Sequence, residues 1–206
     1  MIKQTFMEVL PDVWPMLIII TVIISSLRIA YLITKHKKFL LHKEIIYLLA
    51  IIYILCLFHV VTFQDINYGE SNFVPFKEIF RYSFGSRKFI RNVLGNIILF
   101  IPFGFLSSYL LKNRHLSVVT ILTLIASGTI ETVQYYIGRV FDIDDIILNL
   151  IGGIVGFLIF IGLDAIRNKV KLLKNDTVLD ILIIIIILVL VMVYSLNINV
   201  FDLIGG

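Results

Sequence analysis

The chain has 206 residues, of which 59% are hydrophobic and 16% are charged, with a net charge of +4 and a mean hydropathy of +1.01. Soluble domains are about 45–50% apolar, so this excess, arranged in long runs, excludes an ordinary soluble domain and predicts an integral membrane protein. The single cysteine, Cys56, excludes a disulfide within the chain. For a membrane protein of this composition we expect no nucleic-acid partner.

Six apolar stretches are long enough to cross a bilayer, which takes roughly 20 mostly apolar residues. They cover approximately residues 13–33, 45–63, 93–111, 117–137, 146–163 and 178–196. Sheet is not expected between them, because open strand edges cannot be satisfied in lipid. We therefore predict an all-α fold, a polytopic transmembrane helical bundle that forms a single domain over residues 1–206.

The distribution of lysine and arginine predicts the orientation of the bundle. The connections after the first, third and fifth helices carry ten basic residues, and the N-terminus with the other connections carries seven. This bias places both termini outside. Three histidines, His36, His42 and His115, lie beside the inner basic groups and are predicted to be solvated.

The connection after the second helix departs from this pattern. In "NFVPFKEIFRYSF" (72–84), Pro75 stands where a first helical turn would begin, and phenylalanines then recur at helical spacing. This pattern predicts a short helix in the membrane interface near 75–84. Five basic residues here are candidates to bind anionic head groups: Lys77, Arg81, Arg87, Lys88 and Arg91. The alternative is a solvated polar face over a phenylalanine anchor.

Polar residues of three consecutive helices are predicted to reach one level at the outer side of the membrane. The candidates for a polar pocket there are Asn92, Asn96, Glu131, Gln134, Arg139, Asp142, Asp144, Asp145 and Asn149. An ionised carboxylate within the bilayer costs about 2.5–3.5 kcal/mol, so Glu131 is expected to be paired, protonated or facing a water-filled pocket. Asn96 and Asn149 alternatively form interhelical hydrogen bonds.

Structural roles account for part of this polarity. Asp142 or Asp144 suits the N-cap of the fifth helix, and one such residue suffices. Arg139 is expected either to neutralise an aspartate or to face the pocket. Gly152 and Gly156 form a face of small residues on which another helix is predicted to pack.

Four segments, in this order along the chain, resemble the VanZ-like family of bacterial membrane proteins. They are "NFVPF" (72–76), "NIILFIPFGF" (96–105), "IETVQ" (130–134) and "GRVFDIDDIILNLIGG" (138–153). The resemblance spans about residues 45–163 and implies a four-helix core with one helix added at each end, in the plasma membrane of a bacterium. It also implies a role at the cell envelope, since the founding member is associated with resistance to teicoplanin, a glycopeptide antibiotic that carries a lipid tail. The family's recurrent polar positions map onto Asn96, Glu131, Gln134, Arg139, Asp142, Asp145 and Asn149.

Three functions are compatible with these features. The leading hypothesis is binding of an envelope lipid, a lipid-linked cell-wall precursor or a lipoglycopeptide at the outer face. The second is an enzyme acting on a lipid-linked phosphate, with Glu131 as general base, Asp142 and Asp145 as weak candidates for a divalent cation, and Arg139 on the phosphate. The third is a small transporter whose third helix is interrupted at Pro102. The sequence identifies no cofactor.

Overall fold

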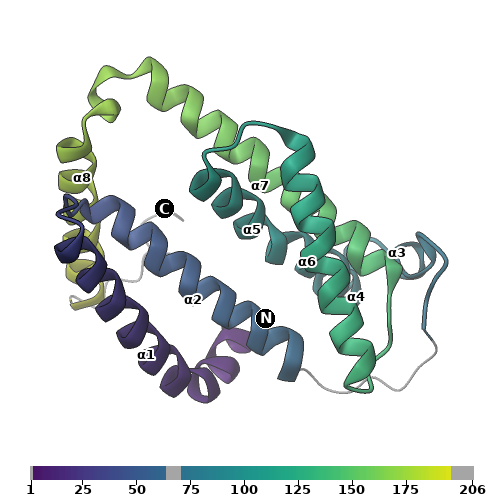
Figure 1. The fold of residues 1–206 in the computed structure, drawn as a ribbon. Coiled ribbons are helices and arrows are strands. Elements are labelled where there is room, and N and C mark those ends of the chain that lie inside the picture. Colours follow the sequence, from purple (N-terminus) through teal and green to yellow (C-terminus); the bar gives the residue numbers. More distant parts are fainter. Residues whose placement is uncertain (1, 64–70, 196–206) are drawn as a thin grey trace. The chain divides into compact units, whose positions relative to one another are not determined.

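The structure of the protein is a computed structural model, which describes residues 2–63 and 71–195, with side chains described over 14–60 and 71–189 (Figure 1). Its elements are α1 (Ile2–Thr34), α2 (Leu41–Phe63), α3 (Lys77–Arg81), α4 (Arg87–Phe89), the π-helical η1 (Ile90–Leu94), α5 (Gly95–Leu111), α6 (Leu116–Tyr136), α7 (Ile143–Lys169), the 3₁₀-helical η2 (Lys171–Lys174) and α8 (Asp176–Ser195). Every regular element of the described backbone is thus helical, and the predicted all-α fold is confirmed.

Within the described residues, five helical segments are long and apolar enough to cross a membrane. They are Trp14–Thr34, Leu41–Val60, Arg87–Leu111, Leu116–Tyr136 and Ile143–Lys169. These segments coincide with the first five predicted spans. The sixth predicted span, 178–196, falls on α8, but the side chains of its last part lie outside the described residues. That sixth crossing stays a prediction.

The chain divides into two compact units. The first contains residues 1–18 and 52–165, and so holds α5, α6 and most of α7. The second contains residues 19–51 and 166–206, and so holds the second half of α1, the first half of α2 and α8. The assignment of the whole chain to one domain stays a prediction.

In the first unit, α7 packs closely against α5 because glycines line the face of α7 that meets it (Figure 1). A Cβ atom on Gly152 would overlap the carbonyl oxygen of Ile97, and one on Gly156 would overlap that of Ile101. Backbone atoms cannot move aside as a flexible side chain can, so only glycine fits at these positions. The predicted packing role of the glycine face is confirmed.

The adjoining face of α7, at Gly153, meets α6. A Cβ atom on Gly153 would overlap the Thr123 side chain of α6, and one on Gly104 of α5 would overlap the backbone of Gly153. Phe100 of α5 is fully buried in this three-helix core. These contacts fix α5, α6 and α7 against one another. They thereby fix the relative positions, along the helix axes, of the polar residues on the three helices.

The third span is regular where a break was predicted. Pro102 lies inside α5, which continues as one α-helix from Gly95 to Leu111. The expectation of an interruption at Pro102 is therefore wrong, and with it the structural argument for a transporter. The irregular part precedes α5, where Ile90–Leu94 forms a π-helix. One π turn inside a helix inserts an extra residue and changes the direction of the side chains that follow.

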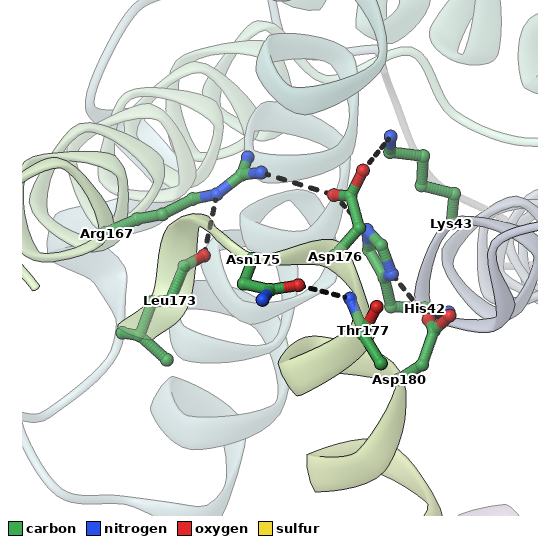
Figure 2. A network of polar contacts seen from close by, with 8 residues as sticks. All are labelled: His42, Lys43, Arg167, Leu173, Asn175, Asp176, Thr177 and Asp180. Carbon is green, nitrogen blue, oxygen red and sulfur yellow. Dashed lines mark hydrogen bonds and ion pairs between the residues drawn. The ribbon is translucent and has the colours of Figure 1, made fainter. Parts of the chain in front are cut away.

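In the second unit, the start of α2 is joined to the start of α8 by charged side chains (Figure 2). The Nδ1 atom of His42 lies 2.6 Å from Oδ1 of Asp180, and Nε2 lies 3.5 Å from Oδ1 of Asp176. Lys43 and Arg167 approach Asp176 to 3.7 and 3.8 Å. His42 is 4% exposed, so the prediction that it is solvated is wrong, because two acidic residues of α8 cover it; the other two histidines of that prediction are exposed.

Candidate functional site

The candidate site lies where the start of α5, the end of α6 and the start of α7 meet (Figure 1). Asn96 of α5 donates from Nδ2 to Oδ1 of Asp145 on α7, at 2.5 Å. The backbone N–H of Asp142 donates to Oε2 of Glu131 on α6, at 3.0 Å. We call the following residues the polar end cluster: Asn96, Glu131, Gln134, Arg139, Asp142, Asp144, Asp145 and Asn149.

Glu131 lies at the centre of these contacts and is 2% exposed. Besides the backbone N–H at Oε2, its Oε1 accepts from the amide nitrogen of Gln134 at 3.0 Å when that amide is oriented to suit its neighbours. In the same orientation the Gln134 oxygen accepts from Nη1 of Arg139 at 2.7 Å. Both carboxylate oxygens of Glu131 are therefore held by N–H donors, and Arg139 is linked to them through Gln134.

Asp142 caps the N-terminus of α7, as predicted for one of the aspartates. Its Oδ1 accepts from the backbone N–H of Asp144 at 2.9 Å, directly before the helix begins at Ile143. The same oxygen accepts from Nδ2 of Asn72 at 2.8 Å. Burial raises the pKa of the Asp142 carboxyl above its ordinary value, and these two hydrogen bonds oppose that shift.

Asp144 has a role that the sequence pattern does not reveal. Its side chain is 1% exposed and accepts from the backbone N–H groups of Phe76, Glu78 and Ile79, at 2.5, 2.7 and 3.2 Å. Glu78 and Ile79 belong to the first turn of α3 and Phe76 directly precedes it, and a helix has no internal acceptors for the N–H groups at its start. Asp144 thus stabilises the start of α3 from a position more than 60 residues away.

The helix predicted near 75–84 is shorter in the structure, where α3 covers Lys77–Arg81. It begins at Lys77, because Phe76 adopts a left-handed backbone conformation with φ of 68°, and it ends where Tyr82 becomes extended. Pro75 therefore lies in the turn before the helix and not in its first turn. Beyond the helix, Phe84 remains 92% exposed.

The segment before α3 is fixed to the start of α7 by backbone hydrogen bonds. Asn72 donates its N–H to the Phe141 carbonyl at 2.8 Å, and its own carbonyl accepts from Ile143 at 3.0 Å. The rings of Phe73 and Phe141 stack with centroids 5.1 Å apart. Asn72 is 4% exposed and was missed as a site residue, although it begins the "NFVPF" segment.

Asn149 continues the cluster one turn deeper into α7. Its Nδ2 donates to Oγ of Ser127 on α6 at 2.9 Å, and the residue is 3% exposed. This is the interhelical hydrogen bond that was the structural alternative for the asparagines. Ser127 is a second residue that the set of candidates omitted.

Asn92 does not share the partners of the cluster. Its Nδ2 donates to the Tyr82 hydroxyl at 2.9 Å, since Asn92 lies within the π-helical η1 whereas Asn96 lies in α5 beyond it. The five head-group candidates are all exposed: Lys77, Arg81, Arg87, Lys88 and Arg91. One of them, Arg81, pairs with Glu78 on the same helix at 3.1 Å.

The geometry can also be compared with the needs of a metal ion. Among the described side chains, no group of three or more histidine, cysteine, aspartate or glutamate residues is arranged to hold one. Of the two weak candidates, Asp142 accepts two hydrogen bonds at Oδ1 and Asp145 accepts one. The arrangement is suited to accepting hydrogen bonds from N–H and O–H groups.

Comparison with protein families gives one match. The family described as VanZ/LLP1 matches residues 44–167, which include the whole polar end cluster, α3 and α4. No curated protein and no solved structure matches the chain.

Proposed function

The chain belongs to the VanZ/LLP1 family, and on that premise we propose that it acts at the outer face of the bacterial plasma membrane, where it binds an envelope lipid, a lipid-linked cell-wall precursor or a lipoglycopeptide. Binding of this kind contributes to teicoplanin-type resistance. The protein has several apolar helices that can cross the membrane, and lipid is therefore its immediate surroundings.

The observation that carries the proposal is a pair of carboxylates, Glu131 and Asp145, that lie inside apolar spans and face each other's helices at one end of the core. Asp142 caps α7 and Asp144 stabilises α3, so both have structural roles. Glu131 and Asp145 also lie inside apolar spans, where carboxylates are rare and mark functional sites. Hydroxyl and amine groups of a sugar or peptide head group are the donors that such oxygens bind.

The segment from α3 to η1 supplies the second part of the proposed site. Its exposed cations suit a phosphate or another anionic group, and its exposed phenylalanines suit acyl chains. Asp144 holds this segment against the start of α7, so the cations and the carboxylates belong to one rigid arrangement. A ligand with a polar head and a lipid tail fits both parts.

The proposal is tested by antibiotic susceptibility in a sensitive Gram-positive host. Wild type, Glu131→Gln and Asp145→Asn are expressed at matched membrane levels, with Asp164→Asn as control because its exposed ion pair with Arg114 lies outside the cluster. We expect protection against teicoplanin but not against vancomycin, which lacks the lipid tail. Protection should be lost in the two cluster variants alone. Full protection by both variants would overturn the proposed site.

The outer location has its own test. In a Cys56→Ser background, a single cysteine is placed by Ser83→Cys, between α3 and α4, or by Ser117→Cys, at the start of α6. A membrane-impermeant maleimide applied to intact cells should label the first variant and leave the second unlabelled until the cells are lysed. The reverse pattern would place the polar end cluster at the inner face.

An enzymatic role is the alternative, and the proximity of Glu131, Asp145 and Arg139 within one cluster favours it. A general base beside a cation is suited to hydrolysis of a lipid-linked phosphate. Purified protein would then release phosphate or a modified lipid from such a substrate, and Glu131→Gln would abolish the release. Binding without release supports the proposed function instead.

A further inference from the structure

The end of α1, in the second unit, holds a cavity that the proposed function does not use. It has a volume of about 480 Å³ and is lined by Ile29, Leu32, Ile33, His36, Lys37 and Phe39. The first span ends at Thr34, so these residues lie at the boundary between apolar and polar surroundings. Three lysines lie directly beyond that boundary: Lys35, Lys37 and Lys38.

Lysines after a helix often serve to satisfy its last carbonyl groups. Here backbone N–H groups satisfy these carbonyls at 3.0–3.1 Å. The N–H of Lys35 donates to the carbonyl of Tyr31, that of His36 to the carbonyl of Ile33, and that of Lys37 to the carbonyl of Leu32. His36 adopts the left-handed conformation that this type of helix end requires, with φ of 48°. The ammonium groups are therefore not needed to cap α1.

Acidic side chains do not neutralise these lysines either. Residues 29–41 contain no aspartate or glutamate, and the next acid along the chain, Glu44, is held by Arg28 through two hydrogen bonds of 2.9 and 3.1 Å. Within the described part of the chain, the three lysines beyond Thr34 form no ion pair, whereas Lys43 approaches Asp176 to 3.7 Å. The segment keeps a concentrated positive charge at the membrane boundary.

The apolar part of the cavity is open. Ile33 is 69% exposed and Phe39 is 60% exposed, and Leu32, at 7%, is the buried member of the lining. An open apolar groove that ends at His36 and Lys37 is complementary to a molecule with an acyl chain and a negatively charged head. A free phosphate ion would leave the apolar part unoccupied.

We infer that the end of α1 binds an anionic phospholipid of the adjacent leaflet, with an acyl chain along Ile29, Ile33 and Phe39 and the phosphate near His36 and Lys37. Clusters of basic residues next to a membrane span attract anionic lipids in this way. The groove adds contact with the chain, so the lipid is held in place and not only concentrated near the surface. This site is independent of the polar end cluster.

Fluorescence quenching in lipid nanodiscs tests the inference. The single tryptophan, Trp14, is removed by Trp14→Phe, and Phe39→Trp places a reporter in the groove. The full-length protein is reconstituted in phosphatidylcholine with rising fractions of phosphatidylglycerol or phosphatidylcholine that carry bromine on one acyl chain. We expect brominated phosphatidylglycerol to reach half-quenching at a fraction about three- to tenfold lower than brominated phosphatidylcholine.

The combined change Lys35→Gln, Lys37→Gln and Lys38→Gln should bring this ratio close to one. The matched control replaces three other exposed lysines of the same unit, Lys169, Lys171 and Lys174, by glutamine and should keep the ratio. Equal quenching by both lipids in the wild-type reporter would overturn the inference. If the control variant lost the preference for phosphatidylglycerol to the same extent, that would also overturn the inference, because net charge and not the groove would then set the lipid preference.

Discussion

Two polar regions of this protein differ in the groups that contact their acidic side chains. In the α2–α8 network of Figure 2, acids face cations: Asp176 lies near Lys43, Arg167 and His42. In the polar end cluster, the carboxylates mostly accept from neutral donors. Three of the donors are backbone N–H groups held by Asp144 alone.

The difference bears on function. Opposite charges that pair within the chain neutralise each other and leave little for a ligand to bind. Carboxylates that accept from neutral N–H groups are held in a fixed orientation without a cation as their direct partner in those contacts. The α2–α8 network is therefore accounted for by its structural role, whereas we propose that the polar end cluster binds a ligand. The following substitutions test this difference between the two regions.

The largest effect is expected from Gly156→Val, which removes the packing that positions the cluster. A side chain here overlaps the Ile101 carbonyl, so the free energy of unfolding should fall by about 3 kcal/mol or more. Thermal unfolding in detergent measures this. Gly162→Ala is the control: nothing lies within 4 Å of a Cβ there, and its higher helix propensity should raise stability by up to about 1 kcal/mol. Equal stability of the two variants would contradict the packing argument.

Asp144→Ala should have the next largest effect, confined to one region. Three N–H groups at the start of α3 lose their acceptor, which costs about 2–4 kcal/mol locally. Hydrogen exchange of the Phe76, Glu78 and Ile79 amides should accelerate by roughly 30-fold or more. Exchange in the first turn of α2 should not change. Unaltered exchange at these three amides would show that Asp144 does not hold α3.

In the other region, His42 and Asp180 should be coupled by about 1–2 kcal/mol. A double-mutant cycle of His42→Ala and Asp180→Ala, read by chemical or thermal unfolding, measures the coupling. The contact of 2.6 Å and the burial of His42 lead us to expect a clear positive value. A value near zero would mean that this network is not structural and would remove the contrast drawn above.

The smallest effect on stability is expected from Arg81→Gln. Its ion pair with Glu78 is exposed, so the free energy of unfolding should change by less than about 0.5 kcal/mol. Affinity for a lipid-linked anionic ligand should nevertheless fall, because a cation of the proposed site is lost. Loss of stability comparable to that of Asp144→Ala would assign Arg81 a structural role instead.

Most of the helices could be predicted from the sequence, because a bilayer demands long apolar runs. The span predicted over 93–111 is α5 with η1 and α4 before it, and the one predicted over 117–137 is α6 almost to the residue. The meeting of Asn96, Glu131 and Asp145 at one end also follows, since consecutive helices alternate in direction. These inferences need only local composition and topology.

The partners of individual side chains could not be predicted in this way. Asp144 and Asp142 are two residues apart, yet one caps its own helix and the other a helix on a distant segment. The burial of His42 likewise depends on Asp180, 138 residues away. Both outcomes are set by tertiary contacts, for which a single sequence carries no periodic pattern.

The π-helical turn at Ile90–Leu94 sets the angular phase of the third span. In an α-helix each residue advances the side-chain direction by about 100°, so one extra residue in a turn shifts everything before it relative to everything after it. Asn92 consequently donates a hydrogen bond to Tyr82, whereas Asn96 donates one to Asp145. Because length and phase are coupled at this point, loss of one residue within the turn would restore an α-helix and leave α5 in place. It would rotate the cation-bearing segment away from the carboxylates.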